Sequence, residues 1–253
     1  MNRLFSLEGK RALVTGASRG LGQAIAVALA DAGADVVCAS SRRSGTDETV
    51  AFIHAAGREA WQVEADLADR GAVLAMADEA ERLAGRIDVL VNNGGTIRRH
   101  PAADYPAEDW DLVLRTNLDS AFLLSQRLGR AMVERGSGKV VNVASLLSFQ
   151  GGITVPAYTA SKHAVAGLTK ALANEWARHG VQVNAVAPGY FATDNTQALR
   201  DDPDRAGQIL GRIPAGRWGA PEDLAGAVVF LASRASDYVN GHVLVVDGGW
   251  MAR

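Results

Sequence analysis

Seven short apolar runs, rich in β-branched residues, recur along this chain and limit its fold more than any other feature. Each run has about the length of one strand and lacks an alternating polar face, as expected of strands that are covered on both sides in a parallel sheet. They are RALVTG (11–16), ADVVCAS (34–40), EAWQVEA (59–65), RIDVLVNN (86–93), GKVVNVAS (138–145), VQVNAVAP (181–188) and HVLVVDGG (242–249).

Segments with helical spacing lie between these runs. Their apolar stripes include Leu21, Ile25 and Leu29 in one segment and Val165, Leu168, Leu172 and Trp176 in another. Alternation of strand and helix predicts right-handed βαβ crossovers. We therefore expect an α/β fold over residues 1–253, a single-domain Rossmann fold whose doubly wound parallel sheet of about seven strands has helices on both faces.

Residues 189–220 form the longest stretch outside this rhythm. The stretch follows a predicted strand end and is rich in glycine, proline and charged residues. Because it is long for a plain connection, we expect it to be a lid over a substrate site.

Composition and charge exclude several kinds of partner. The net charge of −2 provides no basic field for a nucleic acid backbone. No run approaches the roughly 18 apolar residues of a membrane span, and the start resembles no export signal, so we expect a cytoplasmic protein. The single cysteine, Cys38, lies in an apolar run and is expected to be a buried structural thiol.

A glycine-rich turn, VTGASRGLG, follows the first predicted strand. Gly16, Gly20 and Gly22 allow the backbone to turn sharply and to approach a diphosphate, while the following helix offers free amide donors. The spacing is G-x-x-x-G-x-G rather than G-x-G-x-x-G. Although three glycines could form an ordinary loop, their place between a strand and a helix favours dinucleotide binding, with Ser18, Arg19 and Leu21 lining the same turn.

The end of the second predicted strand bears on the choice of dinucleotide. An acidic residue there would bind the ribose 2′-hydroxyl of NAD, but the chain has Ser40, Ser41 and Arg42, followed by Arg43. With Arg19, these cations favour a 2′-phosphate and hence NADP over NAD. The alternative is that the arginines are simply solvated surface residues.

Tyr158 and Lys162 stand four residues apart in the segment VPAYTASKHAV, on one face of a predicted helix that begins at Pro156. A phenol with a pKa near ~10 is a poor proton carrier at neutral pH, and a nearby ammonium group would lower that pKa. Spacing alone also fits an ordinary packed pair. Two further polar residues favour the chemical interpretation: Ser145 at a strand end, and Asn117 inside an otherwise apolar helix.

These features together resemble the short-chain dehydrogenase/reductase family. The match extends from KRALVTGASRGLG to VDGGW, and the motifs occur in the family's order: the glycine turn, Asp66, NNGG, Asn117, Ser145, Tyr158-x-x-x-Lys162 and NAVAPG. One departure is Gly94, where the family usually has alanine.

The resemblance implies an NAD(P)-dependent oxidoreductase acting on CH–OH groups. Tyr158 would be the general acid/base, Lys162 would bind the nicotinamide ribose and lower the tyrosine pKa, Ser145 would polarise the carbonyl, and Asn117 would support a proton relay. The implied cofactor-binding residues are Gly16, Ser18, Arg19, Gly20, Leu21, Gly22, Ser40, Ser41, Arg42, Asp66, Leu67, Asn92, Gly94, Tyr158, Lys162, Pro188 and Gly189.

Longer segments, among them NNGGTIRR, SLLSFQGGITVPAYTASK and RIPAGRWGAPEDL, resemble the 2-deoxy-D-gluconate 3-dehydrogenases, also described as 2-dehydro-3-deoxy-D-gluconate 5-dehydrogenases. That resemblance implies a small anionic deoxy sugar acid as substrate. Residues suited to bind its carboxylate and hydroxyl groups are Arg98, Arg99, Gln150, Arg217 and Trp218, although each could equally be structural.

Two other functions remain open at this point. A 3-oxoacyl carrier-protein reductase would share TGASRGLG, but it predicts a basic surface patch that the composition does not announce. A non-catalytic cofactor-binding regulator would typically lack Tyr158 or Lys162.

We expect no metal site, because His100, His163 and His179 have no ligand-like spacing. Family relatives are commonly tetramers, so we expect a homotetramer with the last strand near a subunit interface.

Overall fold

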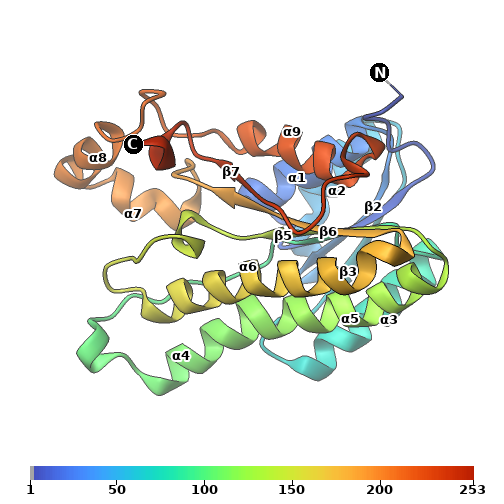
Figure 1. Ribbon diagram of the computed structural model, residues 1–253, viewed down its shortest axis with the longest axis horizontal. Helices are drawn as coiled ribbons and strands as arrows, with labels where there is room; N and C mark the ends of the chain where they lie inside the picture. Colours follow the sequence, from blue (N-terminus) through green and yellow to red (C-terminus); the bar gives the residue numbers. More distant parts are fainter. Residues whose placement is uncertain (1–2) are drawn as a thin grey trace.

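The computed structural model describes residues 3–253, in which seven parallel strands form one sheet in the order β3-β2-β1-β4-β5-β6-β7 (Figure 1). All seven predicted runs are confirmed as strands. They are β1 (Arg11–Thr15), β2 (Asp35–Ser40), β3 (Ala60–Glu64), β4 (Val89–Asn92), β5 (Gly138–Val143), β6 (Val181–Pro188) and β7 (Val243–Val246).

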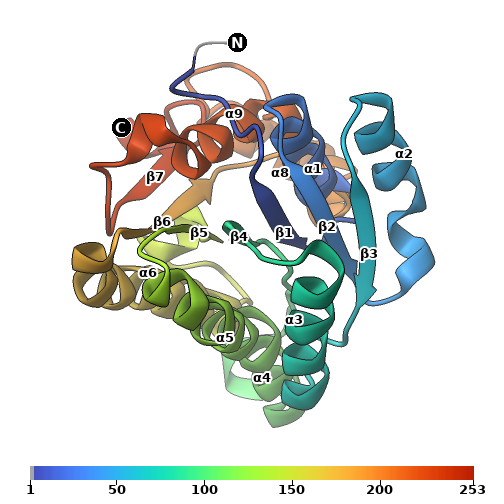
Figure 2. The same ribbon diagram turned by 90° about the vertical axis from the view of Figure 1, so that its right-hand side faces the viewer.

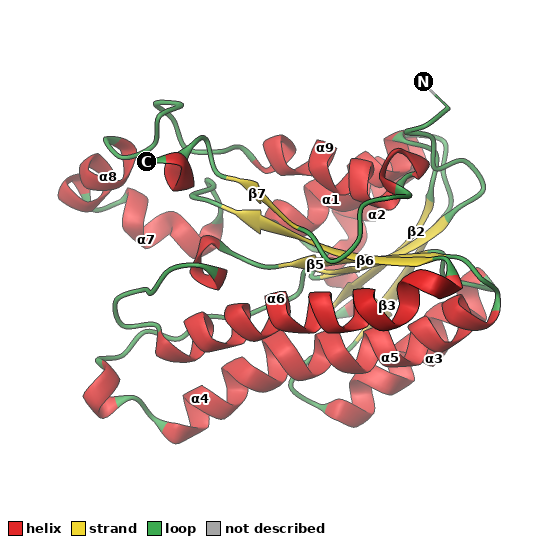
Figure 3. Ribbon diagram, in the orientation of Figure 1, coloured by secondary structure: helices red, strands yellow, loops and turns green. Residues whose placement is uncertain are grey.

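Helices cover both faces of the sheet, so the doubly wound Rossmann fold is confirmed (Figure 2). One face carries α1, α2 and α9, and the other carries α3, α4, α5 and α6 (Figure 3). The helices are α1 (Gly20–Asp31), α2 (Asp47–Ala55), α3 (Arg70–Ala84), α4 (Ala107–Leu114), α5 (Ser120–Glu134), α6 (Pro156–Trp176), α7 (Gln197–Arg200), α8 (Pro203–Leu210) and α9 (Pro221–Ala232).

Two apolar clusters, one on each face of the sheet, form most of the core. Ile25 and Leu29 of α1 are fully buried against the first face, as their helical stripe predicted. On the second face, Leu172 of α6 and Leu128 of α5 are buried against the strands. Because each strand is covered on both sides, its side chains need not alternate between apolar and polar.

The strand order places the site. The order reverses between β1 and β4, whose neighbouring carboxyl ends leave a crevice where ligands of open α/β sheets bind. The segment after β5 and the start of α6 reach the same edge. Pro156 occupies the first turn of α6, where its missing amide hydrogen costs no helical hydrogen bond, so Tyr158 lies near the helix start.

The segment after β6 has structure of its own. Residues 189–220 contain α7, α8 and a short 3₁₀ turn, Asp194–Thr196. Ile209 and Ile213 from this segment pack in a separate apolar cluster with Trp250 near the C-terminus, and Figure 1 shows that terminus beside α8. Within residues 3–253, no helix is both long enough and apolar enough to cross a membrane.

Candidate active site

The glycine-rich turn forms a backbone cradle at the carboxyl end of β1. Gly16 and Gly20 have φ angles of 66° and 55°, in the left-handed region that glycine adopts without strain. A Cβ at Gly22 would collide with the carbonyl oxygen of Gly16, so only glycine lets α1 approach the turn this closely. The first turn of α1 carries no acidic residue and its N-cap, Arg19, makes no side-chain cap bond.

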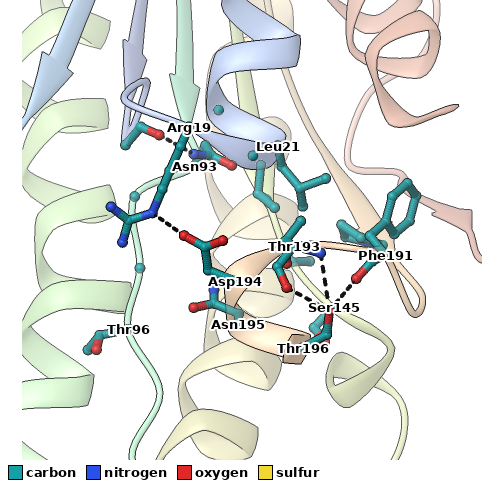
Figure 4. Close-up of a pocket in the computed structure, with 18 of the residues that line it drawn as sticks. Arg19, Leu21, Asn93, Thr96, Ser145, Phe191, Thr193, Asp194, Asn195 and Thr196 are labelled. Atoms are coloured by element: carbon teal, nitrogen blue, oxygen red, sulfur yellow. Dashed lines mark hydrogen bonds and ion pairs between the residues drawn. The ribbon is translucent and has the colours of Figure 1, made fainter. Parts of the chain in front are cut away.

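This cradle opens onto a cavity of about 290 Å³ (Figure 4). The sequence-predicted residues that line it are Gly16, Ser18, Arg19, Gly20, Leu21, Gly22, Gly94, Ser145, Tyr158, Lys162, Pro188 and Gly189. Residues from β1, β4, β5, α6 and β6 therefore converge on one site, although they are spread over most of the chain.

A second cavity, of about 450 Å³, continues from the same turn. Its lining includes Ser40, Ser41, Asp66 and Leu67 from the ends of β2 and β3, and it shares Gly16, Ser18 and Gly94 with the first cavity. Together the two cavities form an elongated space that passes over free amide groups at a helix N-terminus. This shape and these donors fit a dinucleotide, whose diphosphate would lie at the glycine turn.

The arginines predicted to favour NADP have different surroundings. Arg19 Nε lies 2.8 Å from Asp194 Oδ2 across the first cavity, and both side chains are 74% exposed (Figure 4). Arg43 is held by Glu79 and by the carbonyl oxygen of Gln62. Arg42 is exposed and has no ion-pair partner among residues 3–253. Of these cations, Arg42 is the one left available beside Ser41.

Asn92 lines neither cavity, and its place beside the cofactor remains a prediction. Its side chain is buried towards α5 and β5, where Nδ2 donates to Asn142 Oδ1 at 2.8 Å and to Ser125 Oγ at 3.1 Å. Asn93 lines the first cavity instead, and its Nδ2 donates to the carbonyl oxygen of Thr15 at 2.9 Å. Adjacent residues at a strand end face opposite sides of the sheet, and the sequence pattern does not tell them apart.

Gly94 is explained by its neighbours. A Cβ at this position would collide with Leu67 Cδ1, so the leucine occupies the space that the usual alanine methyl would need. The backbone is held in place because Gly94 N donates to Thr15 Oγ1 at 2.9 Å.

The Tyr158 phenol lies where it can meet a reacting oxygen. Burial raises its pKa above the ordinary value, while a hydrogen bond with the Ser145 side chain and the positive charge of Arg99 act in the opposite direction. The expected net lowering of this pKa by Lys162 is therefore not found in this structure. At neutral pH the tyrosine is protonated, the form that donates a proton.

The pKa of Lys162 is also shifted by its surroundings. Its Nζ is buried, donates to the carbonyl oxygen of Val143 at 2.6 Å and lies 5.6 Å from the centre of the Tyr158 ring. Burial lowers its pKa to about 8, because the ammonium loses water and has no carboxylate partner within residues 3–253. The amine is thus aimed into the cavity from the same helix face as the tyrosine, as the four-residue spacing predicted.

Asn117 lies in a single π-helical turn, Arg115–Asp119, between α4 and α5. Its Oδ1 accepts from Thr96 N at 2.8 Å, and its Nδ2 donates to the Thr96 carbonyl at 2.9 Å and to Ser161 Oγ at 3.1 Å. The widened turn points the amide inward, as such turns do at functional sites. Its immediate effect is to fix the segment that follows β4.

The two adjacent arginines proposed for the substrate have different roles. Arg98 Nε lies 3.3 Å from Asp109 Oδ1, and the side chain lines the second cavity. Arg99 has no carboxylate partner within residues 3–253, yet its charge acts on Tyr158. Arg99 is exposed and lines neither cavity, but it is the arginine of this pair that has no carboxylate partner among residues 3–253.

Two further substrate candidates, Arg217 and Trp218, are engaged by other residues. Arg217 forms a two-pronged ion pair with Asp223, at 2.5 and 2.9 Å, so its guanidinium is already engaged. Trp218 packs edge-on against Tyr190 with ring centres 5.6 Å apart. Neither residue lines either cavity, so the structure does not support them as substrate ligands.

One end of the Gln150 side-chain amide, its oxygen, already accepts a hydrogen bond within the protein. Its Oε1 accepts from Trp250 Nε1 at 3.2 Å, across one hundred residues of sequence. The amide Nε2 is the end that remains as a donor, which suits a hydroxyl or carboxylate oxygen.

Sequence reasoning missed several lining residues. Four consecutive residues at the start of the predicted lid line the first cavity, and Thr196 Oγ1 holds their turn by donating to Phe191 O at 2.6 Å and to Thr193 O at 3.0 Å (Figure 4). The available signal was the polar run TDNT directly after a strand end. Thr96 and Val143 also line the cavity and carried no such signal. The missed residues of the lid are Phe191, Thr193, Asp194, Asn195 and Thr196.

Comparison with known proteins agrees with this geometry. A model of the family described as enoyl-(acyl carrier protein) reductase matches residues 16–251. The chain is 58% identical over 250 residues to 2-dehydro-3-deoxy-D-gluconate 5-dehydrogenase of Bacillus subtilis (strain 168), covering 98% of this chain and 97% of the relative.

Two solved structures are similar over almost their whole length. One, from Agrobacterium tumefaciens with bound NADP, is assigned as a 2-deoxy-D-gluconate 3-dehydrogenase; it has a TM-score of 0.93 and 55% identity and covers 100% of both chains. The other is a gluconate 5-dehydrogenase from Burkholderia cenocepacia J2315 in complex with NADP and tartrate, with a TM-score of 0.95 and 42% identity, covering 99% of this chain and 98% of that chain. The protein belongs to the short-chain dehydrogenase/reductase family.

Proposed function

We propose that this protein is an NADP-preferring oxidoreductase that interconverts a hydroxyl and a keto group on a small deoxy sugar acid, as a 2-deoxy-D-gluconate 3-dehydrogenase or 2-dehydro-3-deoxy-D-gluconate 5-dehydrogenase does. One observation carries the proposal. A protonated tyrosine, hydrogen-bonded to a serine, lines the cavity at the dinucleotide cradle, and the charge of Arg99, which has no carboxylate partner among residues 3–253, acts on it. The names of the similar proteins support the same substrate class.

The proton moves through Tyr158. In the reductive direction its phenol donates a proton to the substrate oxygen, and the raised pKa keeps the phenol protonated at neutral pH. In the oxidative direction the phenolate accepts the hydroxyl proton, so this direction requires higher pH. When bound, the nicotinamide supplies or accepts the hydride.

The surrounding side chains hold the reacting groups. Ser145 donates a hydrogen bond to the substrate oxygen, and Lys162 binds ribose hydroxyls of the cofactor with an ammonium whose water has already been removed. Asn117 holds the Thr96 backbone and, through it, one wall of the cavity. Residues 189–220, whose first turn lines that cavity, act as the lid.

Arg99 supplies the selectivity for an acid. Its guanidinium has no carboxylate partner within residues 3–253 and lies close enough to Tyr158 to act on the phenol. A substrate carboxylate would bind it in a two-pronged arrangement, while Gln150 Nε2 donates to a hydroxyl.

The same proposal covers the cell compartment and the assembly. We place the enzyme in the cytoplasm and expect four copies in solution, with β7 at an interface. In the single chain all four residues of β7 are only half-buried, and Phe122 of α5 remains 40% exposed, which supports further burial on assembly. Light scattering of the purified protein measures the number of copies directly.

An assay of the purified enzyme tests the function. NADP⁺ and NAD⁺ are offered with 2-dehydro-3-deoxy-D-gluconate, whose C5 hydroxyl is the group to be oxidised, and NADPH and NADH are offered with 5-keto-D-gluconate or an acetoacetyl thioester. Turnover is followed at the nicotinamide absorbance. We expect turnover of a sugar acid, with NADPH preferred. Turnover of the thioester alone would make the protein a carrier-protein reductase and reject the proposal.

A variant locates the activity in the site. Tyr158→Phe removes only the phenol oxygen, so kcat should fall by about 10²-fold or more, the usual contribution of a general acid. NADPH binding, measured by fluorescence titration, should stay close to wild type. If kcat is retained, another group carries the proton.

A further inference from the structure

A small polar cluster lies outside the catalytic groups and includes one of the two adjacent arginines. It comprises Arg98, His100, Tyr105 and Asp109, which belong to the segment between β4 and α4 and to the first turn of α4. The proposed mechanism uses none of these four side chains.

Asp109 contacts the residues on both sides of Arg99. Its Oδ1 lies 3.3 Å from Arg98 Nε, and its Oδ2 lies 2.7 Å from His100 Nε2. The carboxylate therefore binds two residues that are one position apart from Arg99 in each direction. Asp109 makes no ion pair with Arg99, which lies between these two residues in the chain and whose charge acts on Tyr158.

Further contacts fasten the same segment. The Tyr105 hydroxyl donates to the Arg98 carbonyl at 3.2 Å, and its ring meets the His100 ring edge-on with centres 5.3 Å apart. His100 N donates to the carbonyl oxygen of Thr154 at 3.0 Å, two residues before Pro156 begins α6. The segment that carries Arg99 is thus tied both to α4 and to the approach to the tyrosine helix.

We infer that Asp109 is a positioning residue for substrate recognition: by holding Arg98 and His100, it presents Arg99 to the carboxylate of the sugar acid. The inference rests on the function proposed above and adds a residue that touches neither substrate nor cofactor. A long cation that is held in place before binding loses less conformational entropy when it binds its anion.

The position of Asp109 suits this task. It lies in the first turn of α4, where the helix dipole favours a negative charge, and its side chain is only 22% exposed. Its two partners, Arg98 and His100, are 43% and 37% exposed, and ion pairs with exposed partners add little to the stability of the fold. The consequence of losing Asp109 should therefore appear in substrate binding rather than in unfolding.

Asp109→Asn in the full-length enzyme tests the inference. With NADP⁺ saturating, we expect KM for 2-dehydro-3-deoxy-D-gluconate to rise by about tenfold while kcat stays near wild type. With the methyl ester of the same acid, which offers Arg99 no charge, KM should not change. Asp111→Asn is the matched control, because within residues 3–253 Asp111 pairs only with Arg115, and both side chains are exposed.

A double variant shows whether Asp109 acts through Arg99. Arg99→Ala with Asp109→Asn should bind the acid no more weakly than Arg99→Ala alone, since the cation to be positioned is gone. His100→Phe keeps the ring packed on Tyr105 but removes the nitrogen, and it provides a second variant if Asp109→Asn folds poorly. Its KM for the acid should also rise.

The outcomes separate the two proposals. Sugar-acid turnover by wild type, with Asp109→Asn equal to wild type or equally impaired on acid and ester, overturns the positioning role alone. The positioning role is also overturned if the losses of acid binding caused by Arg99→Ala and Asp109→Asn add up in the double variant. A wild-type enzyme that turns over no sugar acid overturns the proposed function, and the inference with it.

Discussion

At the scale of single residues, burial in the site disfavours the charged forms of its two ionisable side chains. The phenol of Tyr158 and the amine of Lys162 are both removed from water, which raises the first pKa and lowers the second. Each shift favours the uncharged form, so a pair predicted to be phenolate and ammonium is less polarised than the spacing suggested. The sequence identified both residues, but the extent of their burial depends on segments distant in the chain.

The arginines after β2 give a prediction at the same scale. Arg42 has no ion-pair partner within residues 3–253 and follows Ser41, which lines the second cavity, whereas Arg43 is bound to Glu79. Arg42→Ala should raise KM for NADPH by about tenfold and leave KM for NADH unchanged, because only NADP carries the 2′-phosphate. Arg43→Ala is the control and should not alter the ratio. Steady-state kinetics measures KM for NADPH and for NADH. Equal changes in the two KM values would mean that Arg42 does not contribute to the preference for NADPH.

At the scale of elements, the lid is attached to the C-terminus. Trp250 is buried, contacts Tyr190 at 4.7 Å between ring centres and has the Arg212 guanidinium 4.1 Å above its ring. Arg253 donates to the Gly211 carbonyl at 2.7 Å. The last residues of the chain therefore support α8 and, through Gln150, the segment after Ser145.

Loss of the indole should loosen this element. Trp250→Ala should lower the free energy of unfolding by about 3 kcal/mol, as large-to-small changes in cores do, and should speed hydrogen exchange in α8 more than in α1. Trp250→Phe keeps most of the packing and removes only the bond to Gln150, so exchange in α8 should stay near wild type. Mass spectrometry of exchanged peptides makes the comparison. If hydrogen exchange in α8 is unchanged in Trp250→Ala, Trp250 does not stabilise the lid.

At the scale of the whole molecule, Lys162 makes stability depend on pH. Its pKa is about 8 in the folded protein and 10.5 as the ordinary value, so between these limits the unfolded chain binds more protons than the folded one. Stability contributed through this group therefore rises with pH across that window.

A difference between two proteins isolates the effect. Urea unfolding of wild type and Lys162→Met is compared from pH 8 to pH 9.5. The wild-type free energy of unfolding, minus that of the variant, should increase by about 1 kcal/mol per pH unit. A flat or falling difference would mean that Lys162 keeps its ordinary pKa in the folded protein.

The sequence by itself determined the strands, the doubly wound sheet, the glycine cradle and the Tyr158–Lys162 pair. These follow from local properties: β-branched runs make buried strands, glycine alone adopts the turn, and four-residue spacing sets two side chains on one helix face.

Only the tertiary structure decided which of two adjacent residues serves the site. Asn93 rather than Asn92 lines the cavity, and Arg99 rather than Arg98 is left free, because Asp109 takes the other cation. The hydrogen bond between Gln150 and Trp250 likewise depends on the tertiary structure, because it joins residues that are far apart in the sequence. Such choices depend on partners brought close by folding, and no local pattern in the chain records which partner arrives.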